Sequence, residues 1–214
     1  MNSKVIENYK KNLKLNPLQR EIIVGLMLGD GHLETQNQGR TYRLKIEYSE
    51  NQREYIDWLY EIFKDWADKP PQLKIKTLKS GTIVKSLYFS TYSHGALRFY
   101  GQIFYSSGVK IIPKIISKLL TPLGLAIWFM DDGSWKSNHH KTYIIHTDGY
   151  KKKYLLIIEK CLKDKFNIGI ALHKQYDNFR IYVKTESAIR FKDLIQDYLV
   201  PGMKYKLGNN SPKE

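Results

Sequence analysis

The amino-acid sequence contains a weak internal duplication, and this feature constrains the fold more than any other. The first copy reads Leu15-Asn16-Pro17-Leu18, followed by an apolar stretch that ends in Gly29-Asp30-Gly31. The second copy reads Leu120-Thr121-Pro122-Leu123, followed by an apolar stretch that ends in Asp131-Asp132-Gly133. Each copy predicts a helix that begins at a proline and ends at an acid followed by glycine. The chain is therefore expected to fold as two similar halves.

Each copy is followed by the same succession of strands and helices. Residues 40–49 alternate between apolar and charged side chains, which predicts a half-buried strand with a charged face. The elements expected in the first half are a polar loop over 34–40, a strand over 40–49, a helix over 52–66, a hairpin of 73–79 with 82–91, and helices over 93–104 and 113–120. Those expected in the second half are a loop over 134–140, a strand over 141–147, a helix over 150–166, a hairpin of 168–176 with 179–184, and a last helix over 186–199 with Ile189, Phe191, Leu194, Ile195 and Tyr198 pointing inward.

This succession predicts an α+β fold with antiparallel sheets. The boundaries we expect are a basic N-terminal extension over 1–14, a first half over 15–119, a second half over 120–207 and a disordered tail over 208–214. The sequence between the halves contains no Gly/Ser-rich or Pro-rich linker.

Charge selects the class of partner. The chain has 35 Lys and Arg against 21 Asp and Glu, a net charge of +14, so a polyanion such as nucleic acid is the expected partner. Both halves are basic, which indicates that both contact it. The longest apolar runs are far shorter than the roughly 20 residues of a membrane span, so no membrane partner is expected. The single cysteine, Cys161, excludes an intramolecular disulfide framework.

Asp30 and Asp132 are the candidate catalytic acids. Each ends an apolar helix, where the helix dipole disfavours a carboxylate, and the two positions lie 102 residues apart in matching contexts. If the helices pack side by side through the small residues Gly25 and Gly29, the two carboxylates come close together. Like charges at close range repel unless a cation bridges them, and oxygen ligands of this kind suit Mg²⁺. The sequence therefore predicts a metal-assisted phosphodiester hydrolase, with Mg²⁺ as cofactor and Mn²⁺ as its substitute.

The segments over 23–31 and 125–133 resemble the two motifs of the LAGLIDADG homing endonucleases. The similarity is closest to the single-chain, two-motif, intron-encoded members, and it covers about residues 15–207. The resemblance implies two pseudo-symmetric αββαββα halves that meet at the motif helices, with antiparallel sheets forming a saddle for DNA. The second motif departs from the family pattern at Ile127 and Trp128, and the first at Leu28.

The resemblance also implies roles for individual residues. Asp30 and Asp132 match the metal-binding acids, and Gly29 and Asp131 match positions that supply backbone carbonyls to the metals. The other catalytic candidates are Lys110 and Lys206, which stand where the family places a basic residue near each scissile phosphate, with Lys204 competing with Lys206. The implied reaction hydrolyses one phosphodiester in each DNA strand and leaves short 3′ overhangs.

Specific recognition would come from the polar faces of the strands, which reach base edges in the major groove. The candidates for DNA contact are Arg40, Arg43, Lys45, Glu47, Lys74, Lys76, Ser86 and Tyr88 in the first half, and His173, Gln175, Arg180, Tyr182 and Lys184 in the second. The two sets differ, so the target is expected to be long and asymmetric, bound by a monomer. The loops over 34–40 and 134–140 and the lysines over 151–153 are expected to contact phosphates.

Two alternatives remain open from the sequence. The first is a LAGLIDADG maturase, which binds intron RNA and assists splicing. The second is a DNA-binding descendant without catalysis, although such chains often lose the acids. A zinc site at His139, His140 and His146 is not expected, because no fourth nitrogen or sulfur ligand has suitable spacing.

The abundance of Lys, Ile, Asn and Tyr suggests an AT-rich genome. The first residues contain neither an apolar signal core nor the arginines of a transit peptide. These features favour an organelle-encoded protein of a mitochondrion or chloroplast, with a bacterial cytoplasm as the alternative.

Overall fold

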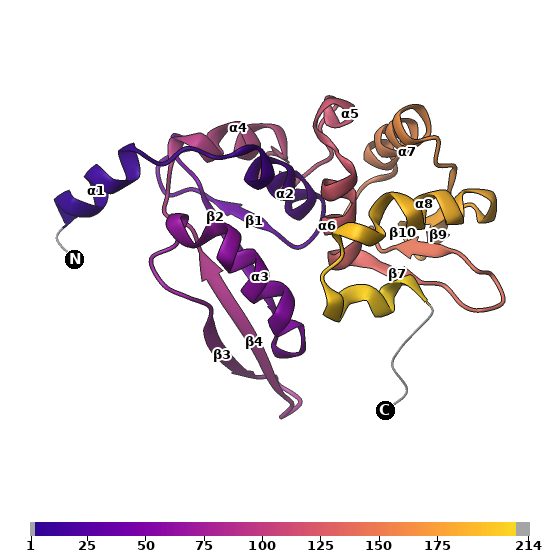
Figure 1. Ribbon diagram of the computed structural model, residues 1–214, viewed down its shortest axis with the longest axis horizontal. Helices are drawn as coiled ribbons and strands as arrows, with labels where there is room; N and C mark the ends of the chain where they lie inside the picture. Colours follow the sequence, from indigo (N-terminus) through magenta and orange to yellow (C-terminus); the bar gives the residue numbers. More distant parts are fainter. Residues whose placement is uncertain (1–2, 209–214) are drawn as a thin grey trace. The chain divides into compact units, whose positions relative to one another are not determined.

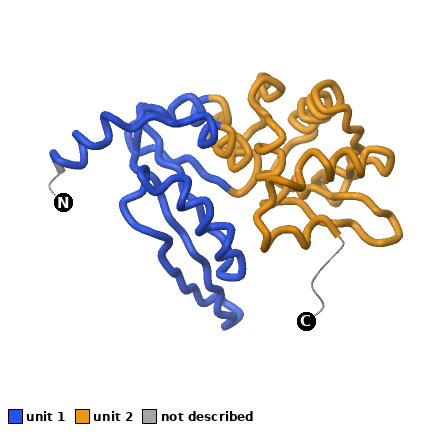
Figure 2. The backbone as a smooth tube through the Cα atoms, in the orientation of Figure 1, with its two compact units in different colours: residues 1–20, 31–102 blue, residues 21–30, 103–214 orange. Residues whose placement is uncertain are grey.

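The computed structural model describes residues 3–208. Its contacts group the chain into two compact units, residues 1–20 with 31–102 and residues 21–30 with 103–214 (Figure 2). This division follows packing, whereas the boundaries expected at 15–119 and 120–207 follow repetition in the sequence, and those boundaries stay a prediction. The tail expected over 208–214 lies outside the described residues, apart from Gly208.

The first unit contains a four-stranded antiparallel sheet. Its strand order is β1-β2-β4-β3. The helices and strands, labelled in Figure 1, are α1 (Ser3–Lys11), the start of α2 (Pro17–Leu28), β1 (His32–Glu34), β2 (Arg43–Ser49), α3 (Arg53–Phe63), β3 (Gln72–Thr77), β4 (Ile83–Ser90) and α4 (Arg98–Ile103). Short 3-10 helices cover Glu50–Gln52, Lys64–Trp66 and Gly95–Leu97.

One face of this sheet forms the core of the first unit. Along β2, Leu44, Ile46 and Tyr48 are buried, and the residues between them are exposed or half-buried. Helix α3 packs on the same face and buries Ile56 and Leu59. Alternation along β2 therefore leaves its charged side chains on the opposite, open face.

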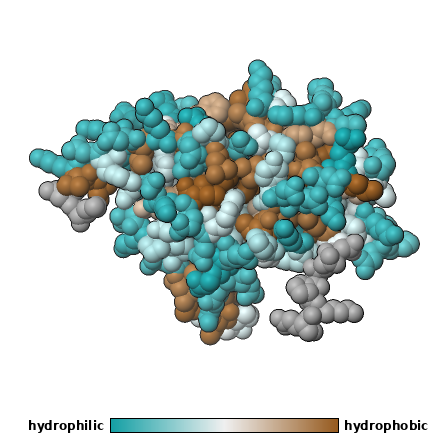
Figure 3. Space-filling model, in the orientation of Figure 1, coloured by the Kyte–Doolittle hydropathy of each residue, from teal (hydrophilic) through white to brown (hydrophobic). Residues whose placement is uncertain are grey.

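The hairpin of β3 and β4 extends beyond the cover of α3. The hairpin expected over 73–79 and 82–91 is present, but every residue of β3 is exposed. Leu73, Ile75 and Ile83 are 49%, 59% and 62% exposed. Figure 3 shows apolar side chains, in brown, at the lower end of this hairpin.

The N-terminal extension contains helix α1, which the sequence analysis did not predict. The Tyr9 hydroxyl donates to the carbonyl oxygen of Asp65 at 2.8 Å, and the Tyr9 ring meets the Tyr92 ring edge-on. Since these contacts are tertiary, periodicity within residues 1–14 could not have revealed them.

The second unit contains a sheet with the same arrangement. Its strand order is β7-β8-β10-β9, and all pairs are antiparallel. The elements are the end of α2, β5 (Tyr105–Ser106), β6 (Val109–Lys110), α5 (Ile116–Leu119), α6 (Pro122–Asp132), β7 (Gly133–Trp135), β8 (Tyr143–Ile145), α7 (Lys152–Phe166), β9 (Ile170–Gln175), β10 (Asn178–Val183) and α8 (Ala188–Ile195). Short 3-10 helices cover Thr185–Ser187, Gln196–Tyr198 and Pro201–Leu207.

The core of the second unit lies between its sheet and α6, α7 and α8. Ile181 and Val183 of β10 are buried on the face that α7 covers with Leu155 and Ile158. On the side of α6 and α8, the rings of Phe129 and Phe191 meet at 5.4 Å between centroids. Helix α6 is buried along nearly its whole length because it packs against several elements.

The order of elements is the same in both repeats. The first repeat runs α2-β1-β2-α3-β3-β4-α4 and the second runs α6-β7-β8-α7-β9-β10-α8. The two sheets also share one strand order, in which the two short N-terminal strands occupy equivalent places. This confirms the α+β fold with antiparallel sheets and the αββαββα halves.

Several expectations about individual elements are wrong. No strand was expected at β1 or β7, because a strand of three residues is too short to show alternation. The last helix is only α8, with 3-10 turns on both sides. Ile189 and Tyr198, expected to point inward, are 77% and 43% exposed, because the buried side of α8 follows Ala188, Phe191 and Ile195.

Within residues 3–208, no helix is both long enough and apolar enough to cross a membrane.

Candidate active site

The two motif helices, α2 and α6, pack against each other through glycine. A β-carbon added at Gly25 would lie 2.5 Å from the carbonyl oxygen of Gly124 and 2.5 Å from Cβ of Ile127. A β-carbon at Gly29 would lie 2.2 Å from Oδ2 of Asp131. The helices therefore approach more closely than a side chain at either glycine would allow. This confirms the side-by-side packing predicted from the small residues of the first motif.

This packing brings the C-terminal ends of both helices to one cavity of about 300 Å³. Asp30 and Asp132 both line the cavity, and Lys110 lines it beside them. The other lining residues are Leu28, Gly29, His146, Thr147, Asp148, Gly149 and Tyr150. Asp30 is exposed, whereas Asp132 is half-buried. The acids predicted from the two motif ends thus share one site.

Burial raises the pKa of Asp132 to about 7, and the negative charge of Asp30 adds to this rise. The indole nitrogen of Trp128 opposes the rise by donating to Oδ2 of Asp132 at 3.2 Å. The charges of Lys110 and Lys206 act in the same direction as Trp128. Together Trp128 and the two lysines do not offset the rise in the pKa of Asp132.

The two candidate lysines contact equivalent carbonyl groups. Lys110 donates from Nζ to the carbonyl oxygen of Gly29. Lys206 donates to the carbonyl oxygen of Asp131 at 3.1 Å and to that of Met130 at 2.5 Å. Gly29 and Asp131 each stand directly before a motif acid. Burial lowers the pKa of both ammonium groups, while the nearby aspartates work against this change.

Asp131 precedes Asp132 in the chain, and Lys204 was the residue expected to compete with Lys206; the structure gives both of them surroundings that differ from those of Asp132 and Lys206. Oδ2 of Asp131 accepts a hydrogen bond from the backbone N–H of Asp30 at 2.9 Å, so this carboxylate joins the ends of the two helices. Asp131 is absent from the cavity lining, which includes Asp132. Lys204 is exposed, whereas Lys206 is half-buried against the motif helix.

One wall of the cavity is the segment 146–150, which the sequence analysis did not single out apart from His146. The Tyr150 hydroxyl donates to the carbonyl oxygens of Leu28 and Met27 at 3.0 and 3.3 Å. These carbonyls lie at the end of α2, where no helical partner is available. Burial raises the pKa of Tyr150, so its phenol stays neutral and continues to donate.

The same segment connects the cavity with the second sheet. Nε2 of His146 lies 3.2 Å from Oγ of Ser134, and burial lowers the pKa of this imidazole. Asp148 accepts from Nε of Arg180 at 3.2 Å. Because Arg180 is a candidate for DNA contact, a residue of the cavity wall positions a residue of the predicted recognition face.

The predicted DNA contacts of the first half share one open face of the first sheet. Register places Glu47 opposite Tyr88 and Lys74 opposite Ser86, so their side chains point to the same side. The members of this face are Arg43, Lys45, Glu47, Lys74, Lys76, Ser86 and Tyr88, with Arg40 exposed in the loop before β2.

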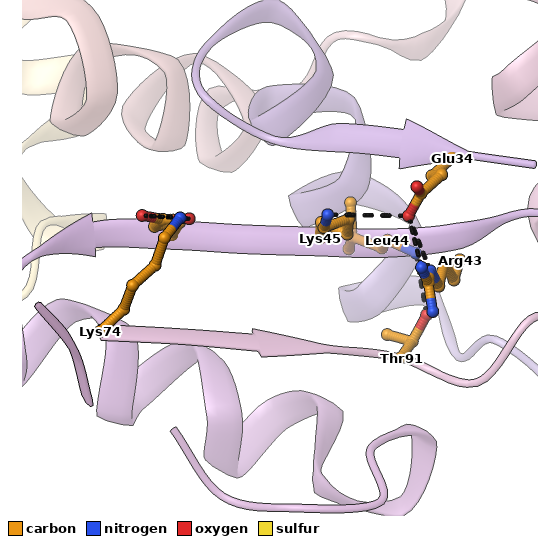
Figure 4. A network of polar contacts seen from close by, with 7 residues as sticks. Glu34, Arg43, Leu44, Lys45, Lys74 and Thr91 are labelled. Carbon is orange, nitrogen blue, oxygen red and sulfur yellow. Dashed lines mark hydrogen bonds and ion pairs between the residues drawn. The ribbon is translucent and has the colours of Figure 1, made fainter. Parts of the chain in front are cut away.

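Ion pairs organise this face (Figure 4). Arg43 and Lys45 approach Oε2 of Glu34 at 2.7 and 3.7 Å. Lys74 donates to both carboxylate oxygens of Glu47 at 2.9 Å, and the Ser86 hydroxyl donates to one of them at 2.7 Å. Surface pairs of this kind hold side chains in place but add little stability.

The predicted contacts of the second half also share one face. His173 pairs with Arg180 across β9 and β10, and Gln175 pairs with Asn178. The rings of His173 and Tyr182 stack at 4.2 Å, and Lys136 lies over the Tyr182 ring at 4.9 Å. Lys184 is exposed directly after β10. Each sheet therefore offers a polar, largely basic face with a different set of side chains.

Comparison with known proteins identifies the family. The model of the LAGLIDADG DNA endonuclease family matches residues 20–191, most of the chain. The chain belongs to this family. Among its curated relatives, the probable intron-encoded endonuclease 1 of Wickerhamomyces canadensis is 31% identical over 96% of this chain and 91% of the relative. The cytochrome b mRNA maturase bI2 of Saccharomyces cerevisiae is 31% identical over 97% of this chain and 51% of the maturase.

A solved structure extends the comparison to the fold. The homing endonuclease I-WcaI bound to its DNA recognition sequence matches with a TM-score of 0.91 and 30% identity. The match covers 98% of this chain and 94% of that chain. The LAGLIDADG fold thus accounts for both αββαββα repeats and for the paired motif helices.

The donor groups at the ends of the LAGLIDADG helices fit a hard divalent cation. The carboxylates of Asp30 and Asp132 line one cavity, and the carbonyls of Gly29 and Asp131 precede them in the chain. Burial and then the negative charge of Asp30 raise the pKa of Asp132, and a bound cation would offset both effects. Among residues 3–208, no three His, Cys, Asp or Glu side chains cluster as a metal cage. Mg²⁺ accepts such a site because it binds through one or two carboxylates together with water and phosphate oxygens.

Trp128, Tyr150 and Ser134 are the site residues that the sequence analysis missed or left without a role. Trp128 stood out only as a departure from the motif, and its donation to Asp132 explains why an indole is useful there. Tyr150 is 122 residues from its partner Leu28, and no pattern in the sequence connects them.

Proposed function

We propose that this protein is a homing endonuclease that cuts both strands of a long, asymmetric double-stranded DNA target. It hydrolyses one phosphodiester in each strand, leaves short 3′ overhangs and thereby initiates intron homing. One chain carries two polar sheet faces with different side chains, which supports a monomer that acts on a target without two-fold symmetry. The maturases and intron-encoded endonucleases among its relatives support synthesis within a mitochondrion or chloroplast.

The observation that carries this proposal is the meeting of both motif acids at one cavity, with a lysine on each equivalent carbonyl. A purely structural role would not need two carboxylates in an environment that raises the pKa of one of them to about 7. The family and the relative bound to DNA support the substrate class.

The residues of this chain divide the work of the reaction. Asp30 and Asp132, with the carbonyls of Gly29 and Asp131, would hold the divalent cation, Mg²⁺ or in its place Mn²⁺. When bound, the cation supplies Lewis acidity toward the phosphate and a water of lowered pKa. Lys110 and Lys206 each place a positive charge beside one site and stabilise the negative charge that grows on the phosphate. Trp128 holds the Asp132 carboxylate in its orientation.

Cleavage of a DNA library tests this function and reveals the target sequence at the same time. A library of AT-rich organellar and randomised DNA is incubated with the protein and Mg²⁺, and every new end is sequenced. We expect discrete paired ends with short 3′ overhangs, and their loss when Mg²⁺ is replaced by EDTA. The double variant Asp30→Asn/Asp132→Asn should produce none of these ends.

A binding assay separates loss of catalysis from loss of folding. The double variant should bind a duplex that contains the recovered site with affinity similar to that of the wild-type protein, because the sheet faces are intact. Random ends, or ends that persist in the double variant, would contradict the proposal.

The maturase is a second candidate because bI2 aligns with nearly the whole of this chain. This chain corresponds to only 51% of that protein, so the similarity does not extend to the rest of the maturase. Tight binding of a structured intron RNA, combined with an absence of DNA cuts, would favour the maturase over the endonuclease.

A further inference from the structure

His146 lines the cavity of the motif acids, yet the proposed reaction gives it no role. It stands directly after β8, and its backbone N–H donates to the carbonyl oxygen of Asp132 at 3.0 Å. This hydrogen bond fixes the start of the 146–150 wall to the end of the second motif helix. The imidazole therefore belongs to the same small site as Asp30, Lys110 and Asp132.

The register of the two sheets identifies the residue that matches His146 in the first repeat. In the second sheet Gly133, directly after Asp132, pairs with Ile145. In the first sheet His32 pairs with Lys45. Extending this register by one residue places Gly31, which directly follows Asp30, opposite Ile46. Ile145 is therefore equivalent to Ile46, and His146 is equivalent to Glu47.

The equivalent residues differ in chemistry. The carboxylate of Glu47 accepts hydrogen bonds from Lys74 and Ser86, so it is occupied within its own sheet and repels a phosphate. An imidazole can instead donate to a phosphate oxygen through an N–H group. The pseudo-symmetry of the motif acids thus does not extend to this position.

Ser134 sets the orientation of the His146 ring. Its Oγ lies 3.2 Å from Nε2, and when the hydroxyl donates to Nε2 the proton of a neutral imidazole resides on Nδ1. Among the described residues, no hydrogen bond from Nδ1 to the protein is present. Nδ1–H is then the group that the site can offer to a ligand.

We propose that His146 donates a hydrogen bond to the scissile phosphate of one DNA strand, the strand that enters the cavity of Asp30, Lys110 and Asp132. Ser134 acts as a positioning residue that holds the required tautomer. Glu47, the residue that matches His146 in the first repeat, has no such donor. The two strands are consequently cut at different rates. This inference rests on the proposed endonuclease function.

The experiment measures the cleavage rate of each strand separately. A duplex that contains the recovered site carries a different 5′ label on each strand, and single-turnover rate constants are measured with saturating enzyme and Mg²⁺. We expect His146→Ala to slow one strand by about 10- to 100-fold, the usual effect of losing a hydrogen bond to a charged group. The other strand should change by less than about threefold, so that nicked duplex accumulates.

Three further variants test whether the change in rate comes from the N–H donor of His146. His146→Gln, which keeps an N–H donor, should recover part of the rate on the affected strand. Ser134→Ala should slow that same strand by a smaller factor. His173→Ala, on the recognition face of the same sheet, should weaken binding while the ratio of the two strand rates stays constant.

The outcomes are distinct. Equal slowing of both strands by His146→Ala, or no slowing of either, overturns the inference. A thermal melt shows whether His146→Ala is folded, and if it is not, His146→Gln and Ser134→Ala decide by the same ratio. A wild-type protein that cuts neither strand would overturn the endonuclease function itself.

Discussion

At the scale of single residues, the site is a compromise between stability and chemistry. Burial and the charge of Asp30 raise the pKa of Asp132 to about 7, above the ordinary value of 3.8. When the pKa of a carboxyl group is higher in the folded state than in the unfolded state, the free energy of unfolding falls as the pH rises from the unfolded pKa to the folded pKa. The metal-free protein should therefore become less stable from about pH 4 to above pH 7 through this group.

Asp132→Asn removes this charge and keeps an acceptor for Trp128. In EDTA at pH 8 we expect the variant to melt above the wild-type protein, by about 2–8 °C for a gain of 1–2 kcal/mol in a chain of this size. Adding Mg²⁺ should raise the Tm of the wild-type protein, and that of the variant far less. Differential scanning calorimetry in both buffers makes the comparison. A lower Tm of Asp132→Asn in EDTA would argue that the carboxylate stabilises the fold.

At the scale of elements, the contact between α2 and α6 decides whether the site forms. Gly25 leaves no room for a β-carbon, since the carbonyl oxygen of Gly124 would lie 2.5 Å away and is part of a helix backbone. Relief would require the two helices to separate along their whole contact.

Gly25→Ala should cost about 1–3 kcal/mol, the usual range for overpacking, and should also reduce cleavage because the motif acids move apart. Gly95→Ala is the matched control, because nothing lies within 4 Å of its added β-carbon. Urea denaturation compares the two variants with the wild-type protein. Equal stability of Gly25→Ala and Gly95→Ala would mean that the helices tolerate a wider separation.

The strands of the second sheet should read bases. Arg180, held by Asp148 on the open face, is the group best prepared for a bidentate contact. Arg180→Ala should lower cleavage about 10- to 100-fold at one target position and relax the preference for the base there. Lys151→Ala, in a segment expected to contact phosphate, should instead weaken cleavage of all target variants alike. Cleavage of a library of single-base target variants measures both patterns.

The elements also show what sequence patterns can and cannot predict. Alternation predicted β2 and its buried face because seven residues are enough to display a period of two. It failed at β1 and β7, which contain three residues each, and burial was wrong at Ile189, whose apolar side chain faces solvent. In the candidate site, the motifs predicted Asp30 and Asp132, and the family resemblance predicted Lys110 and Lys206; the structure places both acids at one cavity and each lysine on the carbonyl before an acid. Trp128, Tyr150 and Ser134 were not, because their partners are fixed by tertiary packing.

At the scale of the whole molecule, the two predicted recognition faces differ in nearly every side chain. A target built by repeating either half-site as a palindrome would present one of the two faces with the wrong bases. We expect both palindromic targets to be cut at least 10-fold more slowly than the recovered site, since a mismatched base pair costs about 1–3 kcal/mol. Competitive cleavage of the three duplexes tests this, and efficient cutting of either palindrome would contradict it.

The compact units do not coincide with the repeats of the chain. The end of α2 and residues 103–119 belong to the first repeat in sequence, yet they pack with the second unit. An exchange of repeats between two relatives would therefore break the packing around Gly25 and Gly29 unless α2 and α6 were inherited together. The side chains on the open faces of the sheets take no part in the contact between α2 and α6. Evolution can thus change the DNA target by substitutions in one β-strand at a time. The paired helices, in contrast, must be passed on as a single heritable block.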